Sequence, residues 1–86
     1  MELSIVIVSW NTCDLLVQCL TSIKDELETL PSLEAEILVV DNASTDGTVE
    51  VIHKQFQKVC VIENKENGGF AHANNQAIRK SQGKYV

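Results

Sequence analysis

Residues 37–48 read Ile37-Leu38-Val39-Val40-Asp41-Asn42-Ala43-Ser44-Thr45-Asp46-Gly47-Thr48, an apolar run that changes abruptly into polar, turn-forming residues. The apolar run is too short for a helix and is rich in β-branched residues, which favour strands. It lacks the alternation of a strand with one wet face, as expected when helices cover both faces of a parallel sheet. The polar residues that follow are common in turns and helix caps. The stretch therefore predicts a buried parallel strand that leads through a turn into a helix.

Two further apolar runs of the same kind occur at residues 3–8 and 59–62, and each predicts another strand. Residues 84–86 have the composition of a strand that is just beginning. Between the first two runs, apolar residues at helical spacing predict a helix with an inward stripe of Leu16, Cys19, Leu20, Ile23 and Leu27. Thr12 or Asp14 is placed to cap the start of that helix.

Two more helices follow from the same reasoning. The second carries the inward stripe Val49, Ile52 and Phe56, with residues 44–46 as candidate caps. The third should run from about Phe70 to Gln82, because Gly83 is a favourable residue just past a helix end. Its inward arc is predicted to contain Phe70, Asn74, Ala77 and Ile78.

The predicted order of elements alternates strand and helix throughout, which defines an α/β fold class. We expect a Rossmann-like parallel sheet with strand order 3-2-1-4 and right-handed crossovers, with helices on both faces. In that order the fourth strand lies at an open edge, which is a candidate surface for self-association. Ligands of such sheets bind beyond the carboxyl ends of the strands.

The composition limits the size and class of the protein. A chain of 86 residues holds one hydrophobic core, so residues 1–86 are expected to form one domain or a portion of one. A net charge of -5 with scattered basic residues argues against a nucleic-acid surface. The run Ile5 to Val8 is too short for a membrane span or a signal peptide, so we expect a cytoplasmic location.

The cysteines and histidines give no sign of a metal or catalytic site. Cys13, Cys19 and Cys60 form no paired motif, and Cys19 and Cys60 are expected to be small core residues. Cys13 lies near a helix start, where a reactive thiol is the alternative. His53 and His72 are expected on the surface.

Three segments rich in short polar side chains follow the predicted strands, at residues 9–11, 41–44 and 64–75. Asp41 comes directly after a strand, where its carboxylate can accept from a pyrimidine N–H or from ribose hydroxyls, or can brace the following turn. Asp46 is better explained by the start of a helix. Trp10 either packs at the edge of the site or seals the core.

The third segment leaves two interpretations open. Gly68 and Gly69 precede a helix, so their backbone N–H groups can approach an anion, or they are simply turn glycines. Asn74 lies on the predicted inward arc and is expected to brace a neighbouring loop, whereas Asn75 at the edge of the arc is expected to contact a ligand. The glycines match neither a Walker loop nor a dinucleotide fingerprint.

Three motifs in order resemble the N-terminal portion of family 2 glycosyltransferases of the GT-A fold. These are residues 4–11, residues 38–48, and residues 67–75, the last in a form similar to that of rhamnosyltransferase-like members. Residues 83–86 resemble the lead-in to the family's metal-binding strand. The resemblance covers the whole chain and implies a role in cell-surface polysaccharide biosynthesis.

The resemblance implies a nucleoside-diphosphate sugar as donor, with a UDP or dTDP carrier, and a glycan or lipid-linked acceptor. The nucleotide-sugar-binding residues that we predict from the polar segments and this resemblance are Ser9, Asn11, Asp41, Asn42, Ser44, Gly68, Gly69, Phe70 and Asn75. In the family, Mg or Mn is held by an Asp-X-Asp motif after the fourth strand, and a later carboxylate is the general base. The chain ends at Val86, before either feature, so we expect no turnover by these residues alone.

Two alternatives belong to other functional classes. One is a non-catalytic nucleotide-binding or interaction fragment with the same sheet. The other is a receiver-like signalling module, which would carry acidic residues after the first strand. Because Ser9, Trp10 and Asn11 stand at that place, the receiver-like interpretation is the weaker.

Overall fold

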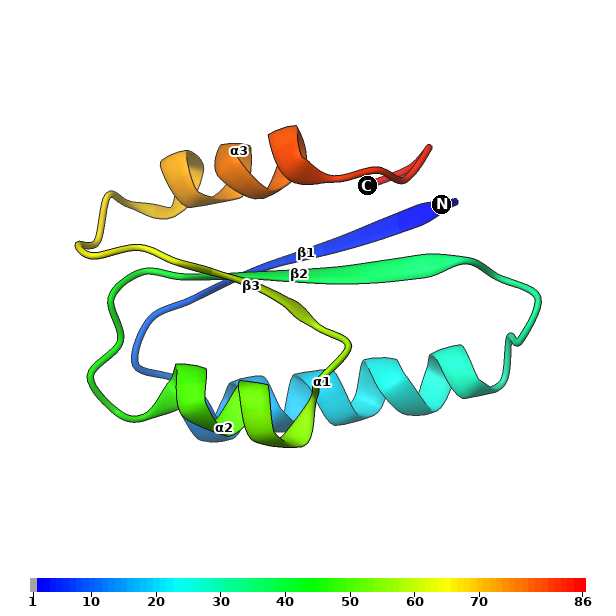
Figure 1. The fold of residues 1–86 in the computed structure, drawn as a ribbon, viewed down its shortest axis with the longest axis horizontal. Helices are drawn as coiled ribbons and strands as arrows, with labels where there is room; N and C mark the ends of the chain where they lie inside the picture. The colour runs from blue at the N-terminus through cyan, green and yellow to red at the C-terminus, as the bar shows by residue number, and fades with distance from the viewer. Residues whose placement is uncertain (1) are drawn as a thin grey trace.

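The computed structural model describes residues 2–86 as alternating strands and helices (Figure 1). In chain order the elements are β1 (Leu3–Ser9), α1 (Cys13–Glu28), β2 (Ala35–Asp41), α2 (Thr48–Gln55), β3 (Cys60–Glu63) and α3 (Phe70–Lys80). The predicted α/β class is confirmed. Across residues 2–86, no helix combines the length and apolar character that a membrane span requires.

The strands form one parallel sheet with the order β1-β2-β3. Ile5 of β1 lies opposite Ile37 of β2, and Val40 of β2 lies opposite Ile62 of β3. The predicted order 3-2-1-4 is not confirmed, because the fourth strand is represented only by an isolated parallel bridge between Leu3 and Tyr85. β1 is thus free along most of its outer edge within the described residues.

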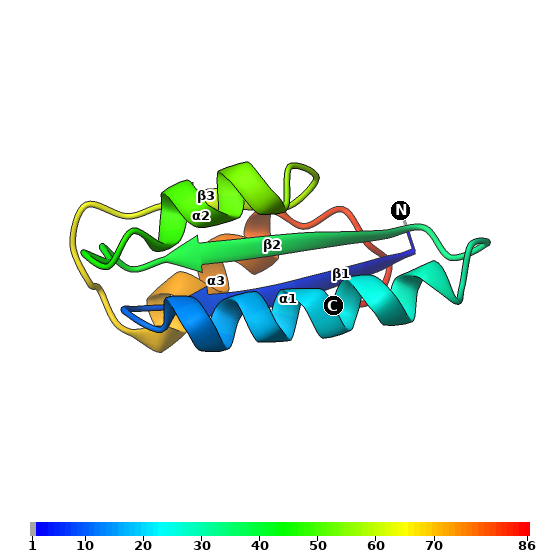
Figure 2. The same cartoon turned by 90° about the horizontal axis from the view of Figure 1, so that it is seen from below.

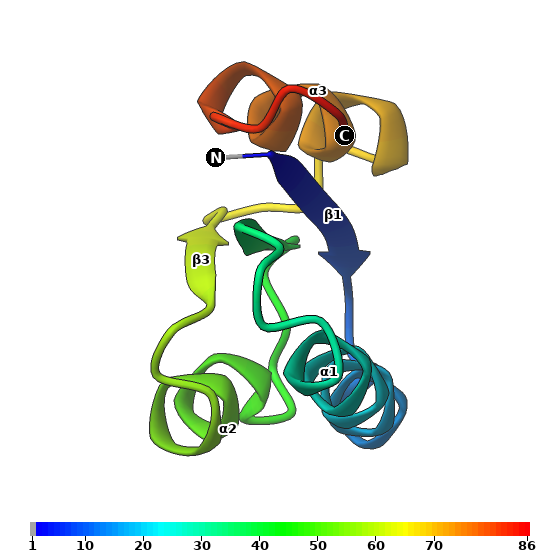
Figure 3. The same ribbon diagram turned by 90° about the vertical axis from the view of Figure 1, so that its right-hand side faces the viewer.

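Helices cover both faces of the sheet, as predicted. Figure 3 shows α1 and α2 on one side and α3 on the other, and Figure 2 views the molecule from the side of α1 and α2. The first face is packed around Leu16, Leu20, Val39 and Ile52, and the second around Leu38, Val40, Ala73 and Ala77. Neighbouring residues of β2 therefore point into different core layers, which is why its sequence is apolar without alternation.

The buried stripe of α3 differs from the prediction in part, because Ala77 is buried as predicted whereas Phe70 and Ile78 are not. Ala73 and Ala77 are fully buried, whereas Phe70 is 69% exposed and Ile78 is 42% exposed. The small side chains of Ala73 and Ala77 let α3 lie close to the sheet, so the larger apolar residues of α3 are left at the sides of this contact. Asn74, expected to face inward, is half-buried.

The expected burial of two cysteines is also wrong. Cys19 is exposed on α1 and Cys60 is exposed at the start of β3. In α1 the buried positions are Leu16 and Leu20, with Ile23 and Leu27 half-buried, so Cys19 lies just outside the inward arc. His53 and His72 are exposed, as predicted.

Of the predicted caps, Asp46 accepts from Thr48 N–H at 3.2 Å at the start of α2, whereas Thr12 does not cap α1 through its side chain. Thr12 and Gly47 are the N-cap residues of α1 and α2, and neither makes a side-chain cap hydrogen bond. α3 ends at Lys80, two residues before the predicted end, because Ser81 takes an extended conformation. Gly83 is not a helix cap, and its close approach to Ser4 explains the glycine instead.

Candidate functional site

The carboxyl ends of the three strands meet at one edge of the sheet. Ser9, Asp41 and Glu63 are register neighbours across β1, β2 and β3. Backbone hydrogen bonds continue beyond the strands, from Asn42 N–H to the Ser9 carbonyl at 2.8 Å and from Asn64 N–H to the Asp41 carbonyl at 2.9 Å. We call this region the carboxyl rim and define it as residues 9–12, 41–47 and 64–70.

Asp41 is buried in the rim and braces the loop that follows it. Its side chain is 2% exposed. Oδ1 accepts a hydrogen bond from Ser44 Oγ at 2.6 Å, and Oδ2 accepts one from Ser44 N–H at 2.9 Å. The turn-bracing role of Asp41 is therefore present in the structure, and its contact with a nucleotide stays a prediction.

Asn11 ties the loop after β1 to the loop after β2. Its N–H donates to Ser44 Oγ at 2.8 Å, and its Oδ1 accepts from Thr45 N–H at 2.8 Å. Asn11 has a φ of 51°, in the left-handed region that asparagine tolerates better than most residues. Ser44 thus lies between Asp41 and Asn11, so these three predicted site residues form one hydrogen-bonded chain.

A second chain of amides joins β2 to the loop before α3. Asn64 Nδ2 donates to Asn42 Oδ1 at 2.9 Å, and Asn42 Nδ2 donates to the Gly69 carbonyl at 3.3 Å. Asn64 and Gln76 form a reciprocal pair, with Asn64 Nδ2 to Gln76 Oε1 at 2.8 Å and Gln76 Nε2 to Asn64 Oδ1 at 3.0 Å. Asn42 is 2% exposed, so this chain satisfies a buried amide.

Gln76 was missed by the sequence analysis. The signal that could have identified it is its position three residues after Ala73 and one before Ala77, the two buried residues of α3. The prediction placed the large apolar residues Phe70 and Ile78 on the inward face of α3 instead. Gln76 takes the loop-bracing role that we had assigned to Asn74.

The exposed layer of the rim contains the groups that a ligand can reach. Gly68 and Gly69 are exposed, and Phe70 and Trp10 are exposed to 69% and 55%. Gly69 has φ 92° and ψ 166°, a conformation that is nearly restricted to glycine, and its N–H donates to Asn67 Oδ1 at 2.9 Å. Asn75 is exposed in the second turn of α3, the helix that begins at the rim. Trp10 does not seal the core.

Asp46 links the starts of two helices. Its Oδ2 accepts from Cys13 N–H at 3.1 Å, and its Oδ1 accepts from Thr48 N–H at 3.2 Å and from the Thr48 hydroxyl. It therefore supplies a cap to α1 from 33 residues away as well as bracing α2, as expected of a carboxylate near helix N-termini. The Thr48 hydroxyl bond, and after it the Cys13 N–H, hold the pKa of Asp46 below its ordinary value.

The described residues do not gather a metal site. Within residues 2–86, no three His, Cys, Asp or Glu side chains lie close enough together to hold a cation. Asp41 is the buried carboxylate of the rim, and both of its oxygens accept from Ser44. These residues alone thus do not fit a divalent cation.

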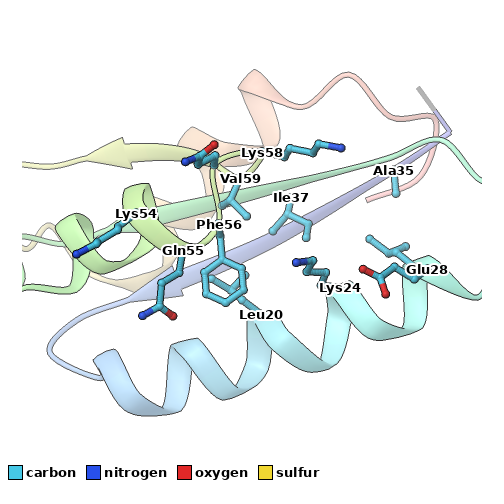
Figure 4. Close-up of a pocket in the computed structure, with 12 residues that line it drawn as sticks. Leu20, Lys24, Glu28, Ala35, Ile37, Lys54, Gln55, Phe56, Lys58 and Val59 are labelled. Atoms are coloured by element: carbon cyan, nitrogen blue, oxygen red, sulfur yellow. The ribbon is translucent and has the colours of Figure 1, made fainter.

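A hollow of about 560 Å³ lies away from the rim (Figure 4). It opens between α1 and α2 near the start of β2, and its apolar lining includes Leu20, Ile37, Phe56 and Val59. Because the amino end of β2 is the opposite end of the sheet from Asp41, this hollow and the rim are separate features.

Several known proteins are similar to this chain in sequence. Poly(ribitol-phosphate) beta-glucosyltransferase of Bacillus spizizenii is 37% identical over 90 residues, which cover 100% of this chain and 14% of that protein. The teichuronic acid biosynthesis glycosyltransferase TuaG of Bacillus subtilis, a putative assignment, is 32% identical over 96% of this chain and 32% of its own length. This chain therefore spans less than a third of the length of these relatives.

Solved structures extend the likeness to the fold. The structure of Staphylococcus aureus TarS 1-349 with UDP-GlcNAc matches 100% of this chain and 26% of its own, with a TM-score of 0.79 and 26% identity. A Pyrobaculum calidifontis mannosyltransferase with GDP-Man and Mn²⁺ matches 94% of this chain and 24% of its own, with a TM-score of 0.62 and 26% identity. The architecture of residues 2–86 matches the N-terminal GT-A portion of TarS, and the family model for glycosyl transferase family 2 matches residues 4–86. The chain belongs to glycosyl transferase family 2.

Proposed function

We propose that this chain forms the nucleotide-binding part of a glycosyltransferase that transfers a sugar from a nucleoside-diphosphate sugar to an acceptor. Family membership supports the reaction class. The observation that carries the site is the carboxyl rim, where loops from three parallel strands are joined by cross-loop hydrogen bonds through Asn11, Ser44, Asn42 and Asn64. Such a rim offers a rigid floor with exposed amides and glycine backbone above it.

The donor that we propose carries uridine or thymidine diphosphate. The TarS structure described above contains UDP-GlcNAc, whereas the mannosyltransferase structure contains GDP-Man. In our proposal Ser9 and Asn11 line the nucleotide pocket, and Asp41 accepts from a base N–H with the lone pairs that Ser44 leaves free. The stretch from Gly68 to Asn75 lies over the nucleoside and diphosphate.

The chemical step needs groups that residues 2–86 do not bring together. A departing diphosphate needs its negative charge neutralised, and the acceptor hydroxyl needs a base. We propose that Mg or Mn and the base are held by residues outside this chain; the Mn²⁺ in the mannosyltransferase structure supports the use of a divalent cation. The acceptor that we propose is a glycan or a lipid-linked glycan, and the likeness to rhamnosyltransferases in particular stays a prediction.

Titration of the 86-residue chain with UDP, dTDP and ATP, with and without Mn²⁺, tests the binding part of this proposal. We expect UDP or dTDP to bind with a dissociation constant on the order of 0.1 to 1 mM and to shift rim amides in NMR spectra. Equal binding of ATP, or shifts confined to the hollow between α1 and α2, would overturn it.

Variants separate a direct contact from a structural effect. Asp41→Ala should abolish binding, but it also removes both Ser44 bonds. Asn75→Ala is the cleaner test, because this exposed residue carries no part of the two hydrogen-bonded chains of the rim. We expect it to weaken UDP binding about threefold to tenfold through one lost hydrogen bond. Gln18→Ala, on an exposed position of α1, is the matched control and should leave affinity unchanged.

A non-catalytic nucleotide-binding fragment is the second candidate, and the lack of a grouped metal site within residues 2–86 favours it for the chain as it stands. A donor-hydrolysis assay with Mn²⁺ tests what both candidates have in common, namely that the 86-residue chain does not itself contain a complete catalytic site. We expect no turnover, and clear turnover by the 86-residue chain would show that it contains a complete catalytic site.

A further inference from the structure

A polar cluster lies at the end of the sheet opposite the carboxyl rim. Ser4 is 0% exposed and comes just before the apolar residues of β1. Its Oγ donates to Glu36 Oε2 at 2.6 Å and accepts from Gly83 N–H at 2.8 Å. The same Glu36 oxygen accepts from Gln82 N–H at 2.6 Å. One carboxylate oxygen and one hydroxyl thus hold two consecutive backbone N–H groups.

The segment held by this cluster then runs beside β1. Tyr85 N–H donates to the Glu2 carbonyl at 3.1 Å, and Ser4 N–H donates to the Tyr85 carbonyl at 2.7 Å. Figure 1 shows the start of β1 and the C-terminal segment close together at this place. A Cβ at Gly83 would lie 2.6 Å from both Ser4 N and Ser4 Oγ, so the approach needs glycine.

We propose that Glu36 and Ser4 form a carboxylate latch that positions residues 82–85 and fixes their parallel register on the free edge of β1. This register also determines which residue of a longer strand would lie beside Ser9 at the rim. Leu3 pairs with Tyr85, and Ser9 at the rim is six residues further along β1. Chain that continued in this register would reach the level of Ser9 six residues beyond Tyr85. A slip of one residue would turn every side chain of that strand to the opposite face.

The choice of a charged residue fits this role. Hydrogen bonds to an ionised carboxylate are shorter and stronger than neutral ones, and both bonds to Glu36 are 2.6 Å long. The Ser4 hydroxyl, and after it the Gln82 N–H, lower the pKa of Glu36, because both bonds stabilise its ionised form. Glu36 is thus a positioning residue. The effect of this register on a nucleotide site at the rim rests on the proposed function, whereas the latch between Glu36, Ser4 and residues 82–83 does not.

Amide hydrogen exchange of the 86-residue chain tests the latch directly. In Glu36→Gln, the amides of Gln82, Gly83 and Tyr85 should exchange at least roughly tenfold faster, because their anchor has lost its charge. The amides of Val39 and Val40 in β2 should keep their protection. Glu26→Gln, which removes the same charge from an exposed position of α1, should change neither set.

Ser4→Ala is the second variant, and it separates a latch from general destabilisation. It should release Gly83 and Tyr85, and combining it with Glu36→Gln should add little, since both act on one unit. Unchanged exchange at residues 82–85 in Glu36→Gln, or an equal increase in β2, would overturn the proposal. Failure of the chain to bind UDP would contradict the proposed function and leave these exchange results unaffected.

Discussion

Replacing Gln76 by alanine is expected to destabilise the fold by about 1 to 2 kcal/mol. The change removes two amide hydrogen bonds to Asn64, of 2.8 and 3.0 Å, and leaves Asn64 with its bond to Asn42. Unsatisfied polar groups cost about 1–3 kcal/mol when buried, and Asn64 is only half-buried, so we take the lower part of that range. Alanine is also the better helix former, which offsets a few tenths of a kcal/mol.

Urea unfolding followed by circular dichroism measures this loss, and thermal unfolding should show a midpoint lower by about 4–15 °C for a chain of this size. Asn75→Ala is the matched control on the same helix. Its exposed side chain has no place in the Asn42–Asn64–Gln76 chain, so its stability should equal or slightly exceed that of the wild type. A Gln76→Ala variant within about 0.5 kcal/mol of the wild type would refute the structural role of the amide chain.

Three further predictions concern the backbone and charges of the rim. Gly69→Ala should lower the free energy of unfolding by about 1–3 kcal/mol, because alanine is strained at a φ of 92°. A steric clash adds nothing, since a Cβ there meets no atom within 4 Å, and unchanged urea unfolding would contradict the prediction. Ala43 has a φ of 65°, which is strained for alanine, so Ala43→Gly should leave the free energy of unfolding unchanged or raise it by up to about 1 kcal/mol. This is the reverse of the usual effect of glycine, and a clear loss of stability in the same assay would be evidence against strain at this position. Asp46 has a folded pKa below its ordinary value of 3.8, so it contributes stability above that pH which is lost as pH falls through the folded pKa. Unfolding free energies measured from about pH 6 to about pH 3 should therefore decline less in Asp46→Asn than in the wild type, and parallel curves would argue against the Cys13 and Thr48 bonds.

The fold was largely predictable because its main signals are local. Apolar runs at residues 3–8 and 37–40 became β1 and β2, extended by a residue or two at their ends. Their lack of alternation correctly indicated helices on both faces. The fourth strand predicted at residues 84–86 is not confirmed, because within this short segment only Tyr85 forms a bridge with β1.

The errors arose where contacts join residues far apart in the chain. The start of α1 is capped by Asp46 across 33 positions, so no local cap rule could identify it. The predicted inward arc of α3 correctly included Ala77 but also took in the large residues Phe70 and Ile78, whereas the close approach to the sheet selects Ala73 together with Ala77. That choice also hid Gln76, whose partner Asn64 precedes the helix.

At Asp41, a structural effect of substitution is hard to separate from the loss of a ligand contact. Asp41 holds Ser44, Ser44 accepts from Asn11, and Asn11 in turn accepts from Thr45. Removing the Asp41 carboxylate therefore loosens Asn11 even if no ligand touches Asp41. Asp41 and Asn11 are parts of one hydrogen-bonded unit, so their substitutions should be non-additive in both stability and nucleotide affinity. Asn75 is exposed and lies outside that unit, so its substitution reports ligand contact without this coupling. The nucleotide affinity of Asn75→Ala is therefore the more direct test of the proposed contact.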